Sequence, residues 1–179
     1  MNSVKLSTIN YQLSTKRGFT LVELLVVIAI IGILAAVVMI AINPLEMMKK
    51  GRDATRFSDI ENVRKSIDIV IAQDPLQFPA TGTRNSTQAG ARTCSSGWVG
   101  MDLCVYLSTF PLDPKNNATF QYQITSNGTN YTIRAKPESE INFSKAVNDG
   151  GEFNTCTSGV SGGGAACWYE VGTNLFLFP

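Results

Sequence analysis

An uninterrupted apolar run is the feature that most constrains this chain. Residues 24–42 contain no charged side chain, and a run of that length can cross a bilayer as a helix. Glu23 lies directly before the run. An acidic side chain beside a membrane span is energetically costly, so it usually marks a functional position. We therefore expect a membrane-spanning helix and a specific partner for the Glu23 carboxylate. The alternative is an interfacial carboxylate without a role.

The residues around Glu23 form a longer motif. Lys16 and Arg17 precede Gly18 and Phe19, and three further residues lead to Glu23. This segment resembles the start of type IV prepilins and type II secretion pseudopilins. The resemblance implies that a prepilin peptidase cuts between Gly18 and Phe19 and methylates the amine of Phe19. It also implies that Glu23 pairs with that amine, in the same chain or in a neighbouring subunit of a filament.

The composition argues against several functional classes. The chain has 179 residues, a formal net charge of +1 and no histidine. Histidine is the commonest general base and metal ligand, and the sequence also lacks a nucleophile motif or paired acids at a recognisable spacing. We therefore predict that the protein is not an enzyme. Because basic residues show no clustered excess, no specific nucleic-acid binding is predicted either.

The cysteines indicate disulfide bonds. All four, Cys94, Cys104, Cys156 and Cys167, follow the apolar run. An even number in an exported domain favours disulfides, although three connectivities are open. We favour Cys94–Cys104 and Cys156–Cys167 because short loops close most readily. Free buried thiols are the alternative, and zinc is disfavoured because no C-x-x-C pair is present.

The flanking charges and the cysteines predict opposite orientations of the membrane span. Two basic residues precede the span, and four follow it closely, namely Lys49, Lys50, Arg52 and Arg56. The usual bias of basic residues would place the following part in the cytoplasm. The resemblance and the disulfide-favouring cysteines both place it outside, and we follow them.

A second helix is predicted after the apolar run. Apolar residues recur at three- and four-residue spacing, which gives one apolar face: Ile60, Val63, Ile67 and Val70. Asp74-Pro75 predicts the end of this helix. Asn43-Pro44 predicts either a kink in one long helix or a break between two helices. The apolar face is expected to pack on a small sheet, with a short coiled coil as the alternative.

A β-hairpin is predicted next. Residues 120–124 and 131–135 alternate between apolar and polar side chains around an Asn127-Gly128 turn. Pro111-Leu112-Asp113-Pro114 precedes the hairpin. This order resembles the major (G-type) pseudopilin of type II secretion and related pilins. Lys115 stands where those proteins usually carry an aromatic residue.

The last segment suggests a disulfide-closed loop and one or two short strands. It is rich in glycine between Gly159 and Gly164. Related pseudopilins often bind calcium in this region, which makes Asp149 and Glu152 the candidate ligands here. Calcium needs six to eight oxygen ligands, so the ligand count favours the alternative, a solvated polar turn. No other cofactor is predicted.

Together these features predict an α+β, pilin-like protein. We expect a leader at residues 1–18, a membrane and assembly helix at 19–43, and an amphipathic helix at 44–74. A loop-rich connection at 75–111 and an antiparallel sheet with a disulfide loop at 112–179 should follow. The resemblance implies a subunit of a type IV pilus or a type II secretion pseudopilus in the bacterial inner membrane, with its head outside the cytoplasm. The implied partners are copies of itself, prepilin peptidase, the assembly platform, minor pilins and membrane lipid. The alternative is a single-span anchored binding protein that forms no filament.

Overall fold

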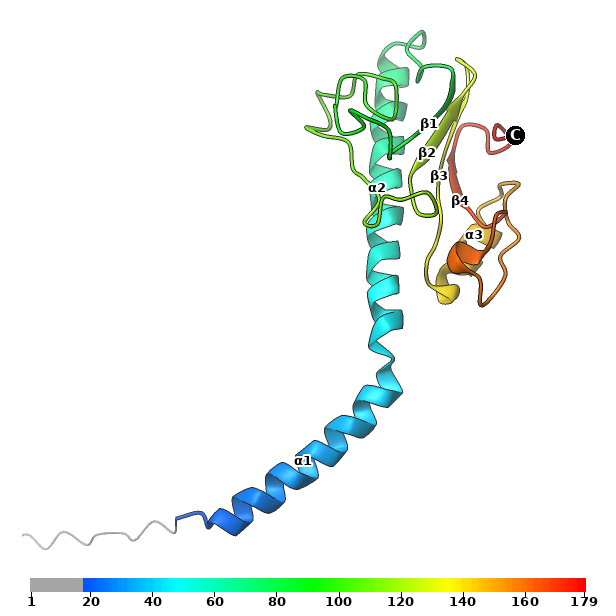
Figure 1. Cartoon of the computed structure of the whole chain (residues 1–179). Helices are drawn as coiled ribbons and strands as arrows, with labels where there is room; N and C mark the ends of the chain where they lie inside the picture. The colour runs from blue at the N-terminus through cyan, green and yellow to red at the C-terminus, as the bar shows by residue number, and fades with distance from the viewer. Residues whose placement is uncertain (1–17) are drawn as a thin grey trace, which may run out of the picture. The chain divides into compact units, whose positions relative to one another are not determined.

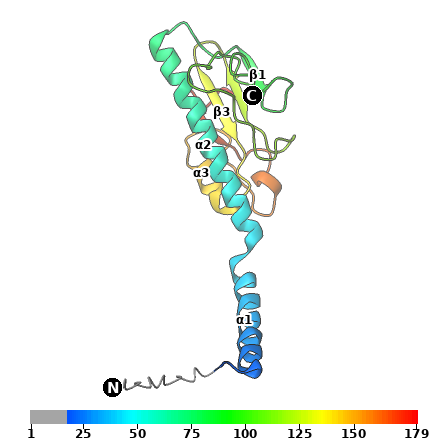
Figure 2. The ribbon, with the colours of Figure 1, turned by 90° about the vertical axis from the view of Figure 1, so that its left-hand side faces the viewer.

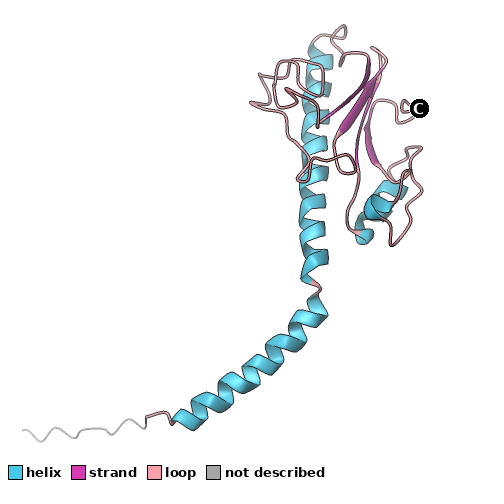
Figure 3. Cartoon of the chain, in the orientation of Figure 1, coloured by secondary structure: helices cyan, strands magenta, loops and turns pink. Residues whose placement is uncertain are grey.

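The computed structural model describes residues 18–179. Residues 1–17, which include Lys16 and Arg17 and most of the predicted leader, lie outside the described residues. The chain divides into two compact units, which meet in the sequence between Asn43 and Pro44. Among the described residues the first unit holds one helix, and the second holds a long helix, three short helices, a sheet and the loops around them (Figure 3).

Helix α1 spans Leu21–Ile42. Thr20 caps its first turn, and the following residues are all apolar apart from Glu23. Residues Leu21–Ile40 have the length and composition of a membrane span. The helix ends at Asn43, whose φ of 46° lies in the left-handed region, a common way for a helix to stop.

Helix α2 spans Pro44–Gln73. Proline suits the first helical position because the missing N–H would have no intrahelical partner there. Of the two alternatives for Asn43-Pro44, the structure therefore has a break between two helices. Asp74 follows the last helical residue and precedes Pro75, which disfavours a further helical turn.

The sheet has four antiparallel strands in the order β1-β2-β3-β4. The strands are β1 Gly82–Asn85, β2 Gln123–Ser126, β3 Tyr131–Ala135 and β4 Tyr169–Gly172. The predicted hairpin is confirmed as β2 and β3, joined by a turn in which Gly128 has a φ of 86°. Strand β1 belongs to the segment predicted as a loop-rich connection.

Helix α2 packs against one face of the sheet (Figures 1 and 2). Its predicted apolar face, Ile60, Val63, Ile67 and Val70, is buried in one core. The sheet contributes Ile124, Tyr131, Ile133 and Val171 to this core, and Tyr122, just before β2, adds a further ring. The connection between β1 and β2 adds Trp98, Leu103 and Phe110 to this core. The α+β fold with a small antiparallel sheet is therefore confirmed.

Three short helices complete the second unit. They are η1 Glu140–Asn142, α3 Phe143–Val147 and η2 Ser161–Gly163. Within this unit η1 and α3 lie beside the first half of α2, whereas β1 and the first part of the connection to β2 lie towards its carboxyl end (Figure 1). We call this second unit, residues 44–179, the head.

Candidate functional site

Glu23 closes a capping box at the start of α1. The Glu23 amide donates to Thr20 Oγ1 at 3.2 Å, and the Thr20 amide donates to Glu23 Oε2 at 2.8 Å. The Thr20 hydroxyl donates to the same carboxylate oxygen at 2.8 Å. Such a box satisfies backbone donors that a helix start otherwise leaves unpaired. The motif therefore fixes the helix start two residues after Phe19.

Within residues 18–179, the capping box engages only one oxygen of the Glu23 carboxylate. All of its bonds go to Oε2, and Oε1 accepts none of the hydrogen bonds found among residues 18–179. The Phe19 side chain is 81% exposed, and the Glu23 side chain is exposed as well. A cation that approaches Oε1 could therefore bind without opening the box.

The surface of α1 is apolar on every side. Its large apolar side chains are between 45% and 84% exposed. A helix that is apolar all round has to be covered, either by lipid or by other apolar helices. The geometry thus brings one carboxylate to the end of a helix whose entire surface needs a partner.

In the head, a buried ionic cluster joins α2 to two later segments. The guanidinium of Arg56 is fully buried and forms a two-pronged contact with Asp113, with Nε to Oδ2 at 2.7 Å and Nη2 to Oδ1 at 3.0 Å. Its Nη1 also donates to Asp53 at 2.8 Å and to Glu138 at 3.3 Å. Charges withdrawn from water are stable only when they are paired in this way.

Two further cations complete the ionic cluster. Arg52 donates to both oxygens of Glu138 at 2.8 and 2.7 Å, and Lys115 donates to Oε1 of Glu138 at 2.5 Å. We use the name ionic cluster for Arg52, Asp53, Arg56, Asp113, Lys115 and Glu138. The charges of its three acids and three bases sum to zero. Lys115, the departure from the pseudopilin pattern, thus supplies one of the cations.

Contacts within the cluster shift the pKa of Glu138 and of Arg56. Burial alone would raise the pKa of Glu138, but hydrogen bonds from Arg52 and Lys115 outweigh it and lower the pKa from 4.5 to about 2. Burial lowers the pKa of Arg56, but its bonds to Asp113 and Asp53 outweigh this effect and raise it. Elsewhere in the head, burial raises the pKa of Asp59 despite the hydrogen bond from Tyr122.

Acidification is expected to destabilise the head through Glu138. Because the folded-state pKa lies below the ordinary value, the contribution of Glu138 is fully present above about pH 4.5 and is lost as the pH falls towards about 2. The free energy of unfolding should therefore fall in that window. Asp59 acts in the opposite direction, since its folded-state pKa is raised.

The matched comparison for this prediction is Glu138→Gln, followed by urea unfolding at several pH values. The variant should be less stable at neutral pH and should lose less of its stability on acidification than the unsubstituted chain. An equally steep loss in the variant would show that Glu138 is not the group responsible.

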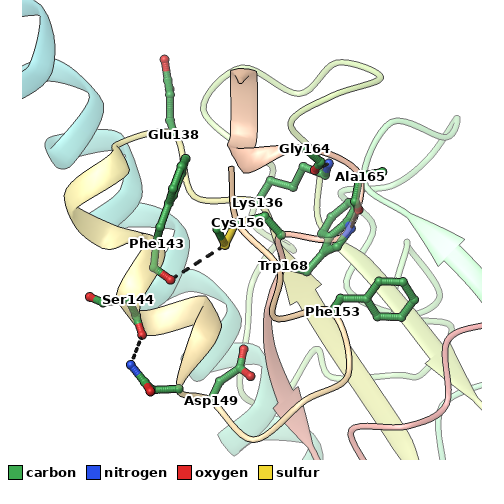
Figure 4. The surroundings of a disulfide bond; sticks show 12 residues. Lys136, Glu138, Phe143, Ser144, Asp149, Phe153, Cys156, Gly164, Ala165 and Trp168 are labelled. Atoms are coloured by element: carbon green, nitrogen blue, oxygen red, sulfur yellow. Dashed lines mark hydrogen bonds between the residues drawn. A yellow bond between two sulfur atoms is a disulfide. The ribbon is translucent and has the colours of Figure 1, made fainter. Parts of the chain in front are cut away.

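Both disulfide bonds expected from the sequence are present in the structure, as Cys94–Cys104 and Cys156–Cys167. The second bond closes the glycine-rich loop. Figure 4 shows Cys156 beside the carbonyl of Phe143 on α3. Gly163 packs so closely that a Cβ there would lie 2.4 Å from the sulfur of Cys167, so this position requires glycine.

Removing the second disulfide is expected to lower the stability of the head. The bond closes a short loop, and loss of a native bridge in a small exported domain commonly costs about 2–5 kcal/mol. Cys156→Ser should therefore shift urea unfolding to lower concentration, whereas Ser158→Ala, an exposed change in the same loop, should leave it in place. Equal midpoints for the two variants would contradict a stabilising role.

The two candidate calcium ligands differ in burial. Asp149 is half-buried and accepts the amides of Gly151 at 2.8 Å and Glu170 at 2.7 Å, whereas Glu152 is exposed. Among residues 18–179 no three histidine, cysteine, aspartate or glutamate side chains gather as a metal site. Calcium binding at Asp149 and Glu152 therefore stays a prediction.

The ionic cluster was not expected from the sequence. In the sequence, Asp113 belongs to the Pro111–Pro114 motif, and Arg52 and Arg56 belong to the basic residues after the span. A signal was nevertheless present, because Asp53 and Arg56 continue the spacing of the buried face of α2 towards its start. Charged residues at such positions need partners elsewhere in the chain.

Comparison with known proteins recognises the amino-terminal segment. Residues 13–39 match the family model for the prokaryotic N-terminal methylation motif. The match contains Gly18, Phe19, Glu23 and most of α1, and it supports the type IV pilin and pseudopilin family. It ends before the head, so it gives no support to the major pseudopilin in particular. No curated protein and no solved structure matches this chain.

Proposed function

We propose that this protein is a structural subunit that prepilin peptidase processes and that then polymerises into a type IV pilus or a type II secretion pseudopilus. The observation that carries the proposal is the methylation motif at residues 13–39, which coincides with the exposed apolar helix α1. The motif accounts for processing, and the apolar surface accounts for both storage in the membrane and packing in a filament. The role is structural and not catalytic.

Processing would create a cation for Glu23, which pairs with none among residues 18–179. Cleavage after Gly18 leaves a positively charged amine on Phe19, and in a filament this amine approaches Glu23 of an adjacent subunit. Oε1 is the acceptor we assign to it, since Oε2 already serves the capping box. Pairing removes the penalty of placing each charge in an apolar bundle. Subunits joined by such repeating, non-closing contacts form an open helical polymer.

The membrane stage also follows from α1. The segment Leu21–Ile40 would hold each subunit in the bacterial inner membrane as a single span, with the head outside the cytoplasm. The two disulfides suit that oxidising side. Partners would be other copies, prepilin peptidase, the assembly platform and minor pilins. A calcium ion at Asp149 and Glu152 is retained as a separate proposal.

Residue size at position 18 tests this function. Gly18→Leu is expected to block leader removal and filament formation, because a large side chain should not fit the peptidase, whereas Gly18→Ala should still be processed. Immunoblotting of membranes shows whether the leader has been removed, and electron microscopy of sheared surface material gives the filament yield. Normal cleavage and filaments from Gly18→Leu would contradict the proposal. A retained leader together with an absence of filaments in the unsubstituted strain would favour the single-span binding protein.

A further inference from the structure

An exposed apolar surface lies at the end of the head where α2 begins. We call it the base surface and define it by Leu45, Met48, Ile141 and Val160. These side chains are 61%, 60%, 62% and 46% exposed. Soluble surfaces scatter such residues singly, but here four of them come from three segments of one end of the head.

Hydrogen bonds fix these segments to one another. Next to Ile141, Ser139 donates through its hydroxyl to Glu46, and Asn142 donates to Asp53 at 3.0 Å. Next to Val160, the Gly159 amide donates to Glu140 at 2.6 Å. The segment of η1 is therefore attached to the first turns of α2, and the glycine-rich loop is attached to η1. Figure 2 shows η1 and α3 beside the first half of α2.

The chain itself places this end of the head close to a membrane. The candidate span ends at Ile40 and α2 begins at Pro44, so only residues 41–43 separate them. Fully extended, that connection reaches about 14 Å. The polar headgroup layer of one leaflet is about 5–8 Å thick. Whenever α1 spans the bilayer, the first turn of α2 must lie in or next to that layer.

The charges around the base surface decide which kind of contact it makes. Lys49 and Lys50 lie beside the apolar residues, but Glu46 and Glu140 lie at the same end, and Glu46 holds Lys49 at 3.1 Å. With two bases and two acids the local charge balances, so attraction to anionic lipid is weak. Apolar side chains with lysines at their edge are typical of segments that lie in a membrane interface, where the lysine ammonium reaches the phosphates.

We propose that the base surface binds the phospholipid interface of the membrane that holds α1. Leu45, Met48, Ile141 and Val160 enter the boundary between headgroups and acyl chains, and Lys50 lies at the phosphate level. The contact holds the head against the bilayer before assembly, so a subunit must release it on entering a filament. This inference rests on the proposed anchoring of α1 but not on polymerisation.

Tryptophan substitution in the full chain tests the contact. Ile141→Trp, Val160→Trp and Leu76→Trp are reconstituted separately, at low protein-to-lipid ratio, into phosphatidylcholine vesicles with and without brominated acyl chains. Leu76 is the matched control, since it is 93% exposed and follows the other end of α2, about 45 Å from the first turn. The native Trp98 and Trp168 are buried and give a constant background that the unsubstituted chain measures.

If the base surface binds lipid, the fluorescence of the tryptophan introduced at position 141 or 160 should fall in brominated vesicles. The fluorescence of the tryptophan introduced at position 76 should not fall. Equal responses at all three positions would overturn the proposal. A blue shift at 141 and 160 that needs high protein density and is insensitive to bromine would also overturn it, because a second copy would then be the partner. Alkali extraction of the same vesicles tests the anchor separately: release of the unsubstituted chain would refute the anchoring of α1 itself.

Discussion

Glu23→Ala is expected to abolish filaments while leaving leader removal and membrane insertion intact. In the proposed filament, the substitution would leave the Phe19 amine of the neighbouring subunit without a partner in an apolar bundle. A buried charge that loses its partner typically costs about 3–5 kcal/mol, which opposes every addition to the polymer. It also removes the Thr20 capping box, although a cap contributes only about 1 kcal/mol. Loss of the pairing with the amine is therefore a larger effect than loss of the capping box.

Glu23→Gln separates charge from shape. The amide keeps the size of the side chain and can still accept a hydrogen bond, but it carries no charge for the amine to neutralise. Few or no filaments are expected from this variant as well. Electron microscopy of sheared material and a processing blot on the same membranes measure both properties. Normal filament yield from either variant, with the leader removed, would show that the carboxylate is not the assembly contact.

Arg56→Met should cause the largest loss of stability in the head. The substitution leaves Asp53 and Asp113 buried without the guanidinium that pairs them. Removing one member of a buried ionic network typically costs about 3–5 kcal/mol. The whole free energy of unfolding of a domain is about 5–15 kcal/mol, so much of the head is expected to be unfolded or degraded.

Arg64→Met is the matched control on the same helix. Arg64 pairs with Glu61 at 2.9 Å and Asp68 at 2.8 Å, but its side chain is 33% exposed. Exposed pairs contribute about 0–1 kcal/mol. Urea unfolding, followed by the fluorescence of Trp98 and Trp168, compares the two variants. Equal losses would show that burial of the ionic cluster does not set its contribution.

The predictable parts of this fold are those that residues close in sequence determine. The apolar face of α2 follows from the spacing of Ile60, Val63 and Ile67, and the β2–β3 hairpin follows from alternation around Asn127-Gly128. The methylation motif is equally local, since Gly18, Phe19 and Glu23 lie within one short segment. Each of these patterns has a single periodicity or spacing that few other structures would produce.

The ionic cluster escaped prediction because its members are distant in sequence. Asp113 is 57 positions from Arg56, and Glu138 is 82 positions from it. Only the folded sheet brings these segments to α2, and charge alone does not say which acid meets which base. The spacing of Asp53 and Arg56 could have marked them as buried, but not their partners.

The first strand and the helix break were only partly predictable. Strand β1 has four residues and lies at the edge of the sheet, so its alternation is too short to stand out from the surrounding loop. At Asn43-Pro44 the proline permits both a kinked and an interrupted helix, and the left-handed conformation of Asn43 selects the interruption. Neither outcome could be read from residue type alone.

The mass of the native amino-terminal peptide tests the central claim most directly. The account predicts a mature chain that begins at Phe19 and carries one methyl group on its amine, with residues 1–18 absent. Purification from membranes followed by intact-mass and peptide analysis would detect it. A retained leader, or a chain that begins after the apolar run of α1, would contradict processing as a pilin-like subunit.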